Sequence, residues 1–161
     1  MNQSVQRAAD LFSHLFGDSD SMLIVFQRFT RTRREKLRVP KKYLGEAIVG
    51  LEDLVIRKNG SLEKRRYCSY KASDLQHRLI FDDVANYRGH LAFYFFDLSR
   101  KIMMHMYDDR GCDIVSTNLD CLAPLYNDFN EWLLDYDRDR MDGVFLREPA
   151  EADRALTSVK V

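Results

Sequence analysis

The feature that most constrains the fold is a series of three strand signals close together in the second half of the chain. The first, residues 91–96, is almost wholly apolar, and the others cover residues 102–107 and 112–116. The connections between them are so short that consecutive strands must run antiparallel. The pattern predicts an antiparallel meander whose first strand is central in the sheet and covered on both faces.

Helix and strand signals elsewhere add further layers to this meander. An apolar stripe at helical spacing predicts a first helix that Ser4 caps and that ends at Phe16. Further patterns predict strands over residues 22–29 and 63–71, and helices over residues 41–54, 74–85 and 119–134. Thr117 or Asn118 can cap the last of these helices, and Pro124 is expected to break it early. We therefore expect one α+β domain over residues 1–147, with an antiparallel sheet of roughly four to five strands and helices packed against it. A loosely ordered C-terminal tail is expected over residues 148–161.

The net charge is zero, but the charges are unevenly distributed. Residues 1–66 contain 14 Lys and Arg against 8 Asp and Glu, whereas residues 67–161 contain 11 against 17. The two halves either neutralise each other by packing or form a polarised surface that steers a charged partner. A neutral total does not favour general nucleic-acid or membrane binding, and no apolar run is long enough to span a bilayer. Three cysteines and no recognisable signal peptide favour a cytoplasmic location.

The sequence contains no complete catalytic or metal-binding motif. The GxSxG, Walker and GxGxxG patterns are absent, and the four histidines form no HExxH pair. Cys68, Cys112 and Cys121 lack the CxxC spacing of zinc sites. The aspartates between residues 135 and 142 do not fit a calcium loop, because Arg140 or Met141 occupies a required position. We therefore expect a protein that is not an enzyme and that holds no cofactor or metal.

Carboxylates, arginines and aromatic residues are concentrated in two segments, residues 107–113 and residues 132–142. In a structural interpretation, aspartates cap the turn before Gly111, Arg110 pairs with a nearby carboxylate, and Tyr107 and Trp132 lie in the core. In a functional interpretation, the carboxylates form an acidic docking face that comprises Asp108, Asp109, Asp113, Asp135, Asp137 and Asp139. The basic run over residues 28–42 is expected to be a solvated loop or edge, and it would suit an acidic partner.

Two blocks in these segments are specific enough to indicate a family. They are Tyr-Asp-Asp-Arg-Gly with a following Asp at residues 107–113, and Asn-x-Trp-Leu-Leu-Asp-Tyr-Asp-Arg at residues 130–138. Over residues 67–145 the chain resembles an uncharacterised bacterial domain family of unknown function, and residues 11–26 resemble its N-terminal part more weakly. Some members resemble immunity proteins of polymorphic or contact-dependent toxin systems. The resemblance implies a small cytoplasmic bacterial protein and assigns no catalytic residue.

The leading hypothesis is a non-catalytic immunity protein that binds and neutralises a cognate toxin domain. Toxins that attack nucleic acid have basic clefts, so an acidic face suits a nuclease-type toxin. One alternative is a small metal-dependent hydrolase or nuclease with a dispersed site, in which Asp108, Asp109 and His105 hold a divalent ion. Another is a nucleic-acid-binding adaptor that uses the basic run, although that run lacks the interleaved aromatic residues of single-strand binding surfaces.

Overall fold

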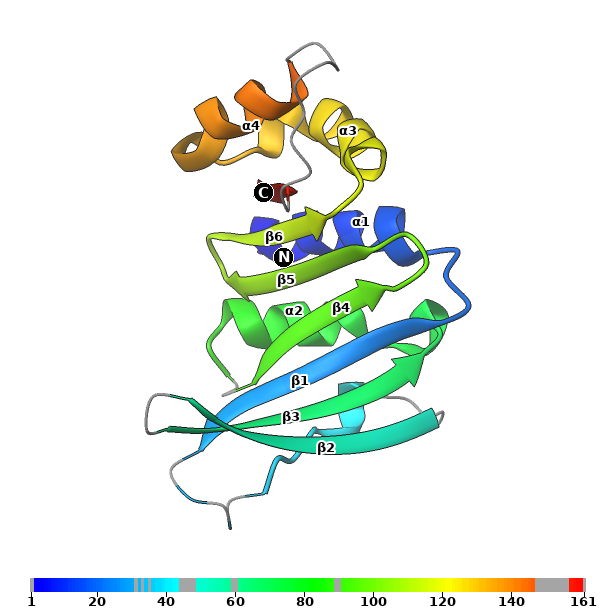
Figure 1. Cartoon of the computed structure of the whole chain (residues 1–161), viewed down its shortest axis with the longest axis vertical. Helices are drawn as coiled ribbons and strands as arrows, with labels where there is room; N and C mark the ends of the chain where they lie inside the picture. The colour runs from blue at the N-terminus through cyan, green and yellow to red at the C-terminus, as the bar shows by residue number, and fades with distance from the viewer. Residues whose placement is uncertain are drawn as a thin grey trace.

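The computed structural model describes residues 2–30, 32, 34, 36–43, 49–58, 61–88, 91–146 and 157–160. The strands in this part of the chain are β1 (Met22–Thr30), β2 (Val49–Lys58), β3 (Ser61–Tyr70), β4 (Ala92–Asp97), β5 (Ile102–Asp108), β6 (Gly111–Ser116) and β7 (Thr157–Lys160). They form one seven-stranded sheet in the order β2-β3-β1-β4-β5-β6-β7 (Figure 1). Every neighbouring pair is antiparallel, so the predicted α+β class is confirmed.

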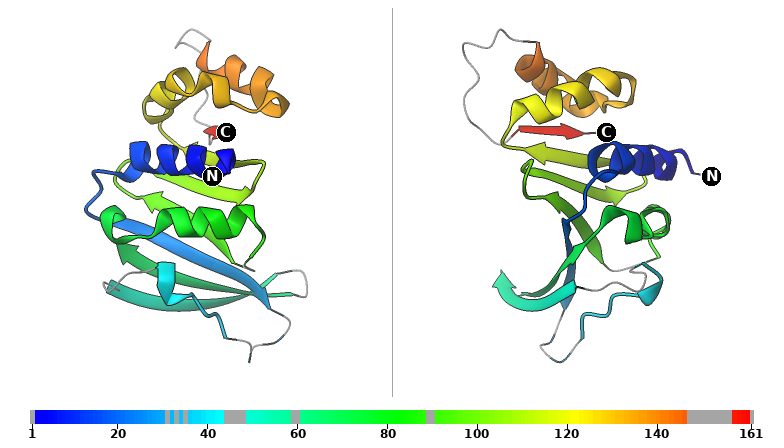
Figure 2. Two further views of the ribbon diagram at one scale, coloured as in Figure 1. Left: turned by 180° about the vertical axis from the view of Figure 1, so that it is seen from behind. Right: turned by 90° about the vertical axis from the view of Figure 1, so that its right-hand side faces the viewer.

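Helices α1 (Gln3–Phe16) and α2 (His77–Ala85) lie across one face of the sheet (Figure 2). Helices α3 (Leu119–Asp128) and α4 (Arg138–Phe145) gather beyond the β7 edge (Figure 1). Short 3₁₀ turns complete the described elements: η1 (Lys41–Tyr43), η2 (Ala72–Asp74), η3 (Asn130–Trp132) and η4 (Asp135–Asp137). Among the described residues, no helix is long and apolar enough to cross a membrane.

The core between the two helices and the sheet is built on aromatic contacts. The ring of Phe12 on α1 lies 5.9 Å from Phe81 on α2 and 5.3 Å from Phe95 on β4, in both cases edge to face. The rings of Phe81 and Phe95 are 5.7 Å apart. All three side chains are buried, and burial of each stabilises the fold by roughly 1.5–3 kcal/mol. The apolar stripe that predicts α1 is therefore the face that joins it to the sheet.

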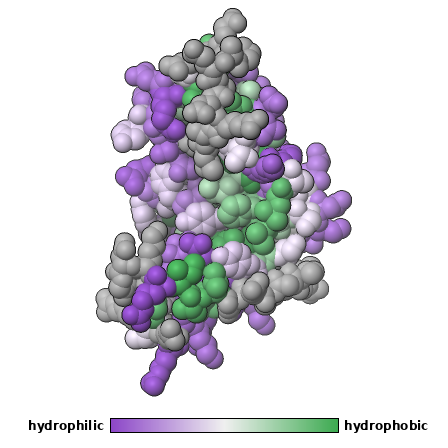
Figure 3. Space-filling model, viewed as in Figure 1, coloured by the Kyte–Doolittle hydropathy of each residue, from purple (hydrophilic) through white to green (hydrophobic). Residues whose placement is uncertain are grey.

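The central position of β4 is confirmed, but the expectation that both of its faces are covered is wrong. Phe93 and Phe95 are buried beneath the helices, whereas Tyr94 and Phe96 on the opposite face are only half-buried. That face is covered by no helix in the described part of the chain (Figure 2). Neighbouring side chains shield each other there, and cross-strand register places Leu23, Phe96, Met103 and Val115 in one apolar row. Figure 3 shows apolar surface over these middle strands.

The predicted helix over residues 41–54 is wrong. Only Lys41–Tyr43 is helical, as the single turn η1, and Val49–Lys58 forms the edge strand β2. Residues 44–48 lie outside the described part. Val49, Val55 and Ile56 are β-branched and suit a strand, and the antiparallel pairing of β2 with β3 overrides the weak helical pattern.

Part of the predicted C-terminal tail is a strand. Thr157–Lys160 forms β7, which pairs with β6 along the register from Asp113↔Lys160 to Ser116↔Thr157. Val159 is fully buried. A four-residue strand is too short to give a periodic signal of its own, and its partner lies about 40 residues earlier in the chain. β2 and β7 account for the difference between the predicted sheet and the observed one.

The helix predicted over residues 119–134 is interrupted. Asn118 caps α3 as expected, since its Oδ1 accepts from the backbone N of Asp120 at 3.1 Å. The helix ends at Asp128, four residues after Pro124, and η3 follows. Trp132 is half-buried against the core, and the Arg7 guanidinium lies 5.2 Å from its ring centroid. At the start of α1, the N-cap is Asn2 rather than the predicted Ser4.

Candidate functional site

Asp108 and Asp109 are adjacent at the β5–β6 turn but have different environments. Asp108 is 5% exposed, and its carboxylate accepts from the backbone N and the Nε of Arg110, both at 2.8 Å. The hydrogen bonds from the Arg110 side chain lower the pKa of Asp108. The structural interpretation is therefore confirmed for Asp108, and its carboxylate offers little surface to a partner. Asp109 is exposed, and its Oδ1 accepts from the Tyr87 hydroxyl at 3.2 Å.

Asp113 and Asp137 lie near each other beside β7. Asp137 forms ion pairs with Lys160 at 3.0 Å and with Arg140 at 3.3 Å, and the Lys160 ammonium beside it lowers the pKa of Asp137. Asp113 stands opposite His105 on one side and Lys160 on the other. Its Oδ1 is buried without a hydrogen-bond partner among the described residues, and burial raises the pKa of Asp113. Both carboxylates are thus drawn into the fold.

Asp135 and Asp139 face solvent on either side of Tyr136, which is 90% exposed and has the most exposed ring among the described large apolar side chains. Three more exposed carboxylates occur in the same region, Asp120, Asp128 and Glu131. We call α3, η3, η4 and α4 together the acidic end. Of the six predicted docking residues, it presents Asp135 and Asp139, while Asp109 is exposed at the β5–β6 turn. Tyr107, expected in the core, is 37% exposed, because it alternates with the inward-facing Met106 and Asp108 on β5.

A cavity of about 320 Å³, which the sequence did not indicate, lies where β4 and β5 diverge. The hydrogen-bonded ladder of these strands extends from Asp97↔Ile102 only to Phe95↔Met104. Beyond it, walls come from β1, residues 38–43, the end of α2 and the separated parts of β4 and β5. The polar and aromatic lining includes Arg28, Arg38, Asp83, Tyr87, Arg88 and Tyr107. We call this space the β4–β5 cavity.

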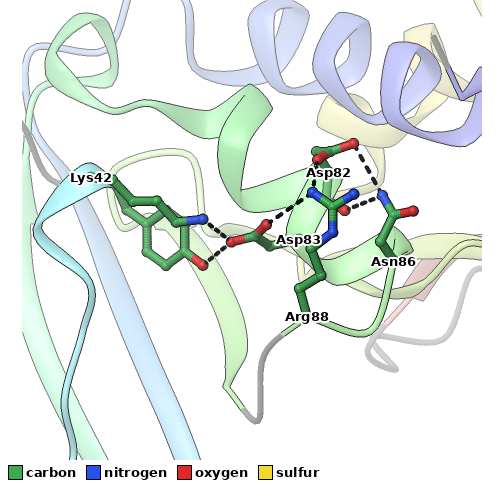
Figure 4. A network of polar contacts seen from close by, with 6 residues as sticks. Lys42, Asp82, Asp83, Asn86 and Arg88 are labelled. Carbon is green, nitrogen blue, oxygen red and sulfur yellow. Dashed lines mark hydrogen bonds and ion pairs between the residues drawn. The ribbon is translucent and has the colours of Figure 1, made fainter.

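A network of polar contacts lies at one wall of the β4–β5 cavity (Figure 4), and Tyr43, Asp83 and Arg88 are its members that line the space. Asp83 is buried and accepts hydrogen bonds from Lys42 Nζ and, at 2.5 Å, from the Tyr43 hydroxyl. Burial opposes ionisation of Asp83, but these two donors lower its pKa, whereas burial and the carboxylate raise the pKa of Tyr43. Arg88 pairs with Asp82 at 3.0 Å and lies 3.8 Å from Asp83. Each charge in this wall therefore has an opposite charge beside it.

Arg28 and Arg38 differ from the wall residues because neither forms a hydrogen bond or ion pair within the described part of the chain. Arg28 is half-buried, and Arg38 is exposed. Burial of a guanidinium is costly unless a partner compensates for the lost water. One feature of the sequence does distinguish Arg28 from the rest of the basic run. Side chains alternate along β1, so the face that carries the inward-facing Ile24 and Phe26 also carries Arg28. The expectation of a solvated run therefore does not hold for Arg28.

Tyr87, at the rim of the cavity, adopts a backbone conformation that is unusual for its type. Its φ is 54°, in the left-handed region. Its N–H donates to the Val84 carbonyl at 3.1 Å and the N–H of Arg88 to the Asp83 carbonyl at 2.9 Å, which is a Schellman motif that closes α2. Glycine commonly occupies this position, and another residue pays roughly 1–2 kcal/mol there. The tyrosine ring is 68% exposed, so its own burial does not offset that cost.

Cys112 and His105 on the central strands both have structural environments. Cys112 is buried, and burial raises the pKa of its thiol to about 12, so it stays protonated at neutral pH. The Nδ1 of His105 lies 2.8 Å from the Phe93 carbonyl, and its ring stacks on Tyr94 at 4.2 Å, as expected for a hydrogen-bonded structural histidine. Burial lowers the pKa of His105 and favours the neutral ring. No group of three His, Cys, Asp or Glu side chains in the described ranges could hold a metal ion.

Comparisons with known proteins place the chain in a family without an assigned activity. It is 30% identical over 43 residues to the uncharacterized protein YnaE of Bacillus subtilis (strain 168), a stretch that covers 27% of this chain and 20% of that protein. No solved structure matches the chain. The model of the family described as Domain of unknown function (DUF3885) matches residues 1–137, which include nearly all described elements except α4 and β7. The chain therefore belongs to the DUF3885 family of domains of unknown function.

Proposed function

We propose that this protein is an immunity protein that binds and neutralises a cognate bacterial toxin domain and catalyses no reaction itself. The observation that carries the proposal is Tyr136, 90% exposed between Asp135 and Asp137 at the acidic end. Tyrosine is enriched among the residues that anchor protein interfaces, since its large ring is amphipathic and has few rotamers to lose. The proposal extends the resemblance of some similar sequences to immunity proteins.

The segment that carries Tyr136 is braced from two sides. Arg138 donates to the side chain and the backbone carbonyl of Asn130, both at 2.9 Å, and the Tyr126 hydroxyl donates to Asp142 at 2.5 Å. On the other side, Lys160 of β7 pairs with Asp137 at 3.0 Å. A surface held in place before binding loses less conformational freedom when a partner docks. The bracing therefore supports a docking role for this part of the acidic end.

The charge around Tyr136 supports a nuclease-type toxin as the partner. Asp120, Asp128, Glu131, Asp135 and Asp139 are all exposed at this end of the molecule. Such a group of carboxylates speeds association with a basic surface and disfavours acidic partners. A nuclease-type toxin, which needs a basic cleft for its substrate, has the matching charge. The metal-dependent hydrolase alternative has less support, because Arg110 engages Asp108 and the Phe93 carbonyl engages Nδ1 of His105.

The test begins with the gene immediately upstream, where an immunity protein predicts a toxin domain, and co-expresses that domain with this chain. We expect the wild-type chain to restore growth of a host that expresses this domain and to co-purify with it at a 1:1 ratio. The triple variant Asp135→Lys, Tyr136→Ala, Asp139→Lys should lose both effects while its circular dichroism stays unchanged. Asp18→Lys with Asp20→Lys, which reverses two exposed charges between α1 and β1, is the matched control and should protect like the wild type.

Each negative outcome has a distinct meaning. If the wild-type chain neither protects the host nor binds the domain, the immunity proposal is wrong for this toxin pair. If the triple variant protects as well as the wild type, the acidic end is not the docking surface.

A further inference from the structure

We propose that the β4–β5 cavity binds a phosphate monoester that carries a flat ring, of the chemical class of nucleoside monophosphates. This site is independent of toxin binding, because its walls belong to β1, α2, β4 and β5 rather than to the acidic end. The argument rests on the charge of the lining, the unpaired state of two arginines, the conformation of Tyr87 and the size of the space.

The charge of the lining matches one phosphate monoester. Lys42 neutralises Asp83, and Asp82 neutralises Arg88, so these four groups contribute no net charge (Figure 4). Arg28 and Arg38 remain, and together they carry two positive charges without partners in the described chain. A phosphate monoester carries a charge of about −1.5 to −2 at pH 7, whereas a single carboxylate carries −1. The phosphate therefore complements both guanidinium groups.

The position of Arg28 strengthens this assignment. Strand register places it on the helix-covered face of β1, opposite Lys64 of β3, and its side chain is half-buried. A guanidinium presents five donors in a planar fork that fits phosphate oxygens in pairs. An arginine that is withdrawn from solvent and lacks an acceptor in the described chain is accounted for if the acceptor is a ligand.

Tyr87 supplies a surface for the ring of the ligand. Its left-handed backbone is a conformation that glycine adopts without strain, yet the position holds a large exposed aromatic residue at the cavity rim. Its hydroxyl donates to Asp109 of the β5–β6 turn, which fixes the direction of the ring. Strained backbone of this kind occurs preferentially at ligand-binding sites. Tyr107, also exposed at the rim, offers a second aromatic face.

The volume favours a small ligand over a polymer. The space of about 320 Å³ lies at the lower end of the range of roughly 300–1,000 Å³ for small-molecule sites. A second hollow, which shares Arg38 with the cavity, is lined by Lys36, Lys64 and Arg66 and has the charge to contact a nucleic-acid backbone, but no aromatic residue lies in its described lining. The β4–β5 cavity combines two arginines that have no partner in the described chain with an aromatic rim, so we assign the ligand to it.

Calorimetric titration of the full chain tests the proposal. The probes are the four 5′-monophosphates of adenosine, guanosine, cytidine and uridine, with ribose 5-phosphate, adenosine and inorganic phosphate as partial ligands. We expect at least one monophosphate to bind, ribose 5-phosphate to bind more weakly, and adenosine to show no binding. Arg28→Gln and Arg38→Gln should each weaken binding by roughly tenfold or more, since each removes a charged donor. Arg57→Gln, an exposed arginine of β2 outside the cavity lining, is the matched control and should leave the affinity unchanged.

The Tyr87→Gly variant separates the ring from the phosphate. Glycine suits the left-handed backbone, so the variant should fold, and its affinity for the monophosphate should fall to that for ribose 5-phosphate. If no monophosphate binds, or if Arg38→Gln binds like the wild type, the proposal is overturned. It is also overturned if an eight-nucleotide single strand binds while all four monophosphates fail, because the ligand is then a polymer. Arg38 is exposed, so its variant tests the site even if Arg28→Gln does not fold.

Discussion

The acidic end and the opposite end of the molecule, where β1, β2, β3 and residues 36–43 lie, use their charges in different ways. Near the β7 edge, Asp137 is paired with Lys160 and Arg140, and Asp142 accepts from Tyr126. At the other end, Arg28 and Arg38 have no partner within the described chain. Several carboxylates that looked available in the sequence thus hold the fold together, while two arginines that looked like a solvated run line a cavity. Charge density alone does not identify a binding surface; the partners of each charge do.

The charge difference between the two halves of the sequence corresponds to these two ends in space. Strands β1, β2 and β3 with residues 36–43 lie at one end of the long axis, and α3 and α4 lie at the other (Figure 1). The halves therefore do not neutralise each other between these two ends, although Lys42 of the first half does pair with Asp83 of the second. The polarised arrangement leaves each end able to meet a partner of opposite charge.

The largest expected loss of stability is at Asp83, the buried carboxylate in the described lining of the cavity. Asp83→Ala should lower the free energy of unfolding by about 3–5 kcal/mol, because Lys42 and Tyr43 lose their acceptor. Urea denaturation measures the change. The adjacent Asp82→Ala is the control and should cost about 1 kcal/mol or less, since Asp82 and its partner Arg88 are both well exposed. Equal losses at the two positions would show that burial does not decide the role of these aspartates.

The next largest expected loss of stability is at Asp108 of the β5–β6 turn, and the neighbouring Asp109 provides the comparison. Asp108→Ala should cost roughly 2–3 kcal/mol, because it removes the acceptor of three hydrogen bonds from Arg110. Asp109→Ala should change the stability by no more than about 0.5 kcal/mol, since its carboxylate is exposed. Thermal denaturation of both variants gives the difference. A large loss for Asp109→Ala would mean that its contact with Tyr87 is structural.

Acid should lower the free energy of unfolding through Asp97, whose carboxylate caps the β4–β5 turn. Burial of Asp97 opposes ionisation, but bonds from Ser99 and Arg100 outweigh it and lower the pKa from its ordinary 3.8 to about 2. The unfolded chain therefore takes up this proton first, so the stabilisation is complete above about pH 4 and is lost as the pH falls towards about 2. Its size is about 2 kcal/mol. Urea denaturation between pH 5 and 2 should show a shallower decline for Asp97→Asn than for the wild type; parallel curves would contradict this assignment.

The smallest expected effect is at the two arginines of the cavity. Arg28→Gln and Arg38→Gln should leave the free energy of unfolding within about 0.5 kcal/mol of the wild type, because neither side chain bonds to another described residue. Denaturant midpoints of both variants, measured beside Asp108→Ala, provide the comparison. A loss above 1 kcal/mol for either arginine would show that it holds the fold together, as the aspartates do.

The sequence was most informative where a pattern is local. The apolar stripe of α1, the meander of β4, β5 and β6 and the Asn118 cap all depend on residues close together in the chain, and each was predicted. The turn role of Asp108 was also predictable, because Asp two residues before Arg110 and three before Gly111 is typical of such turns. β2 and β7 were missed because pairing with another strand, rather than local propensity, determines their structure.

The candidate sites depended on contacts that no local pattern reports. The β4–β5 cavity joins Arg28 to Tyr107, which are far apart in the chain, and it exists because β4 and β5 separate beyond Phe95. Asp137 and Lys160 meet only because β7 returns to the sheet. Whether a charged side chain is free or engaged follows from these long-range contacts. The sequence could therefore name the aspartates but could not distinguish structural from exposed ones.

During synthesis of this protein, β7 is made well after β6, the strand with which it pairs. Forty residues separate Ser116, the last residue of β6, from Thr157, the first of β7. At a synthesis rate of about 5–20 residues per second, β7 is completed roughly 2–8 s after β6. During that interval its backbone N–H and C=O groups form an open edge to which a strand of another nascent chain can pair. High expression should therefore favour misassembly at β6, and slower initiation should raise the yield of correctly folded protein.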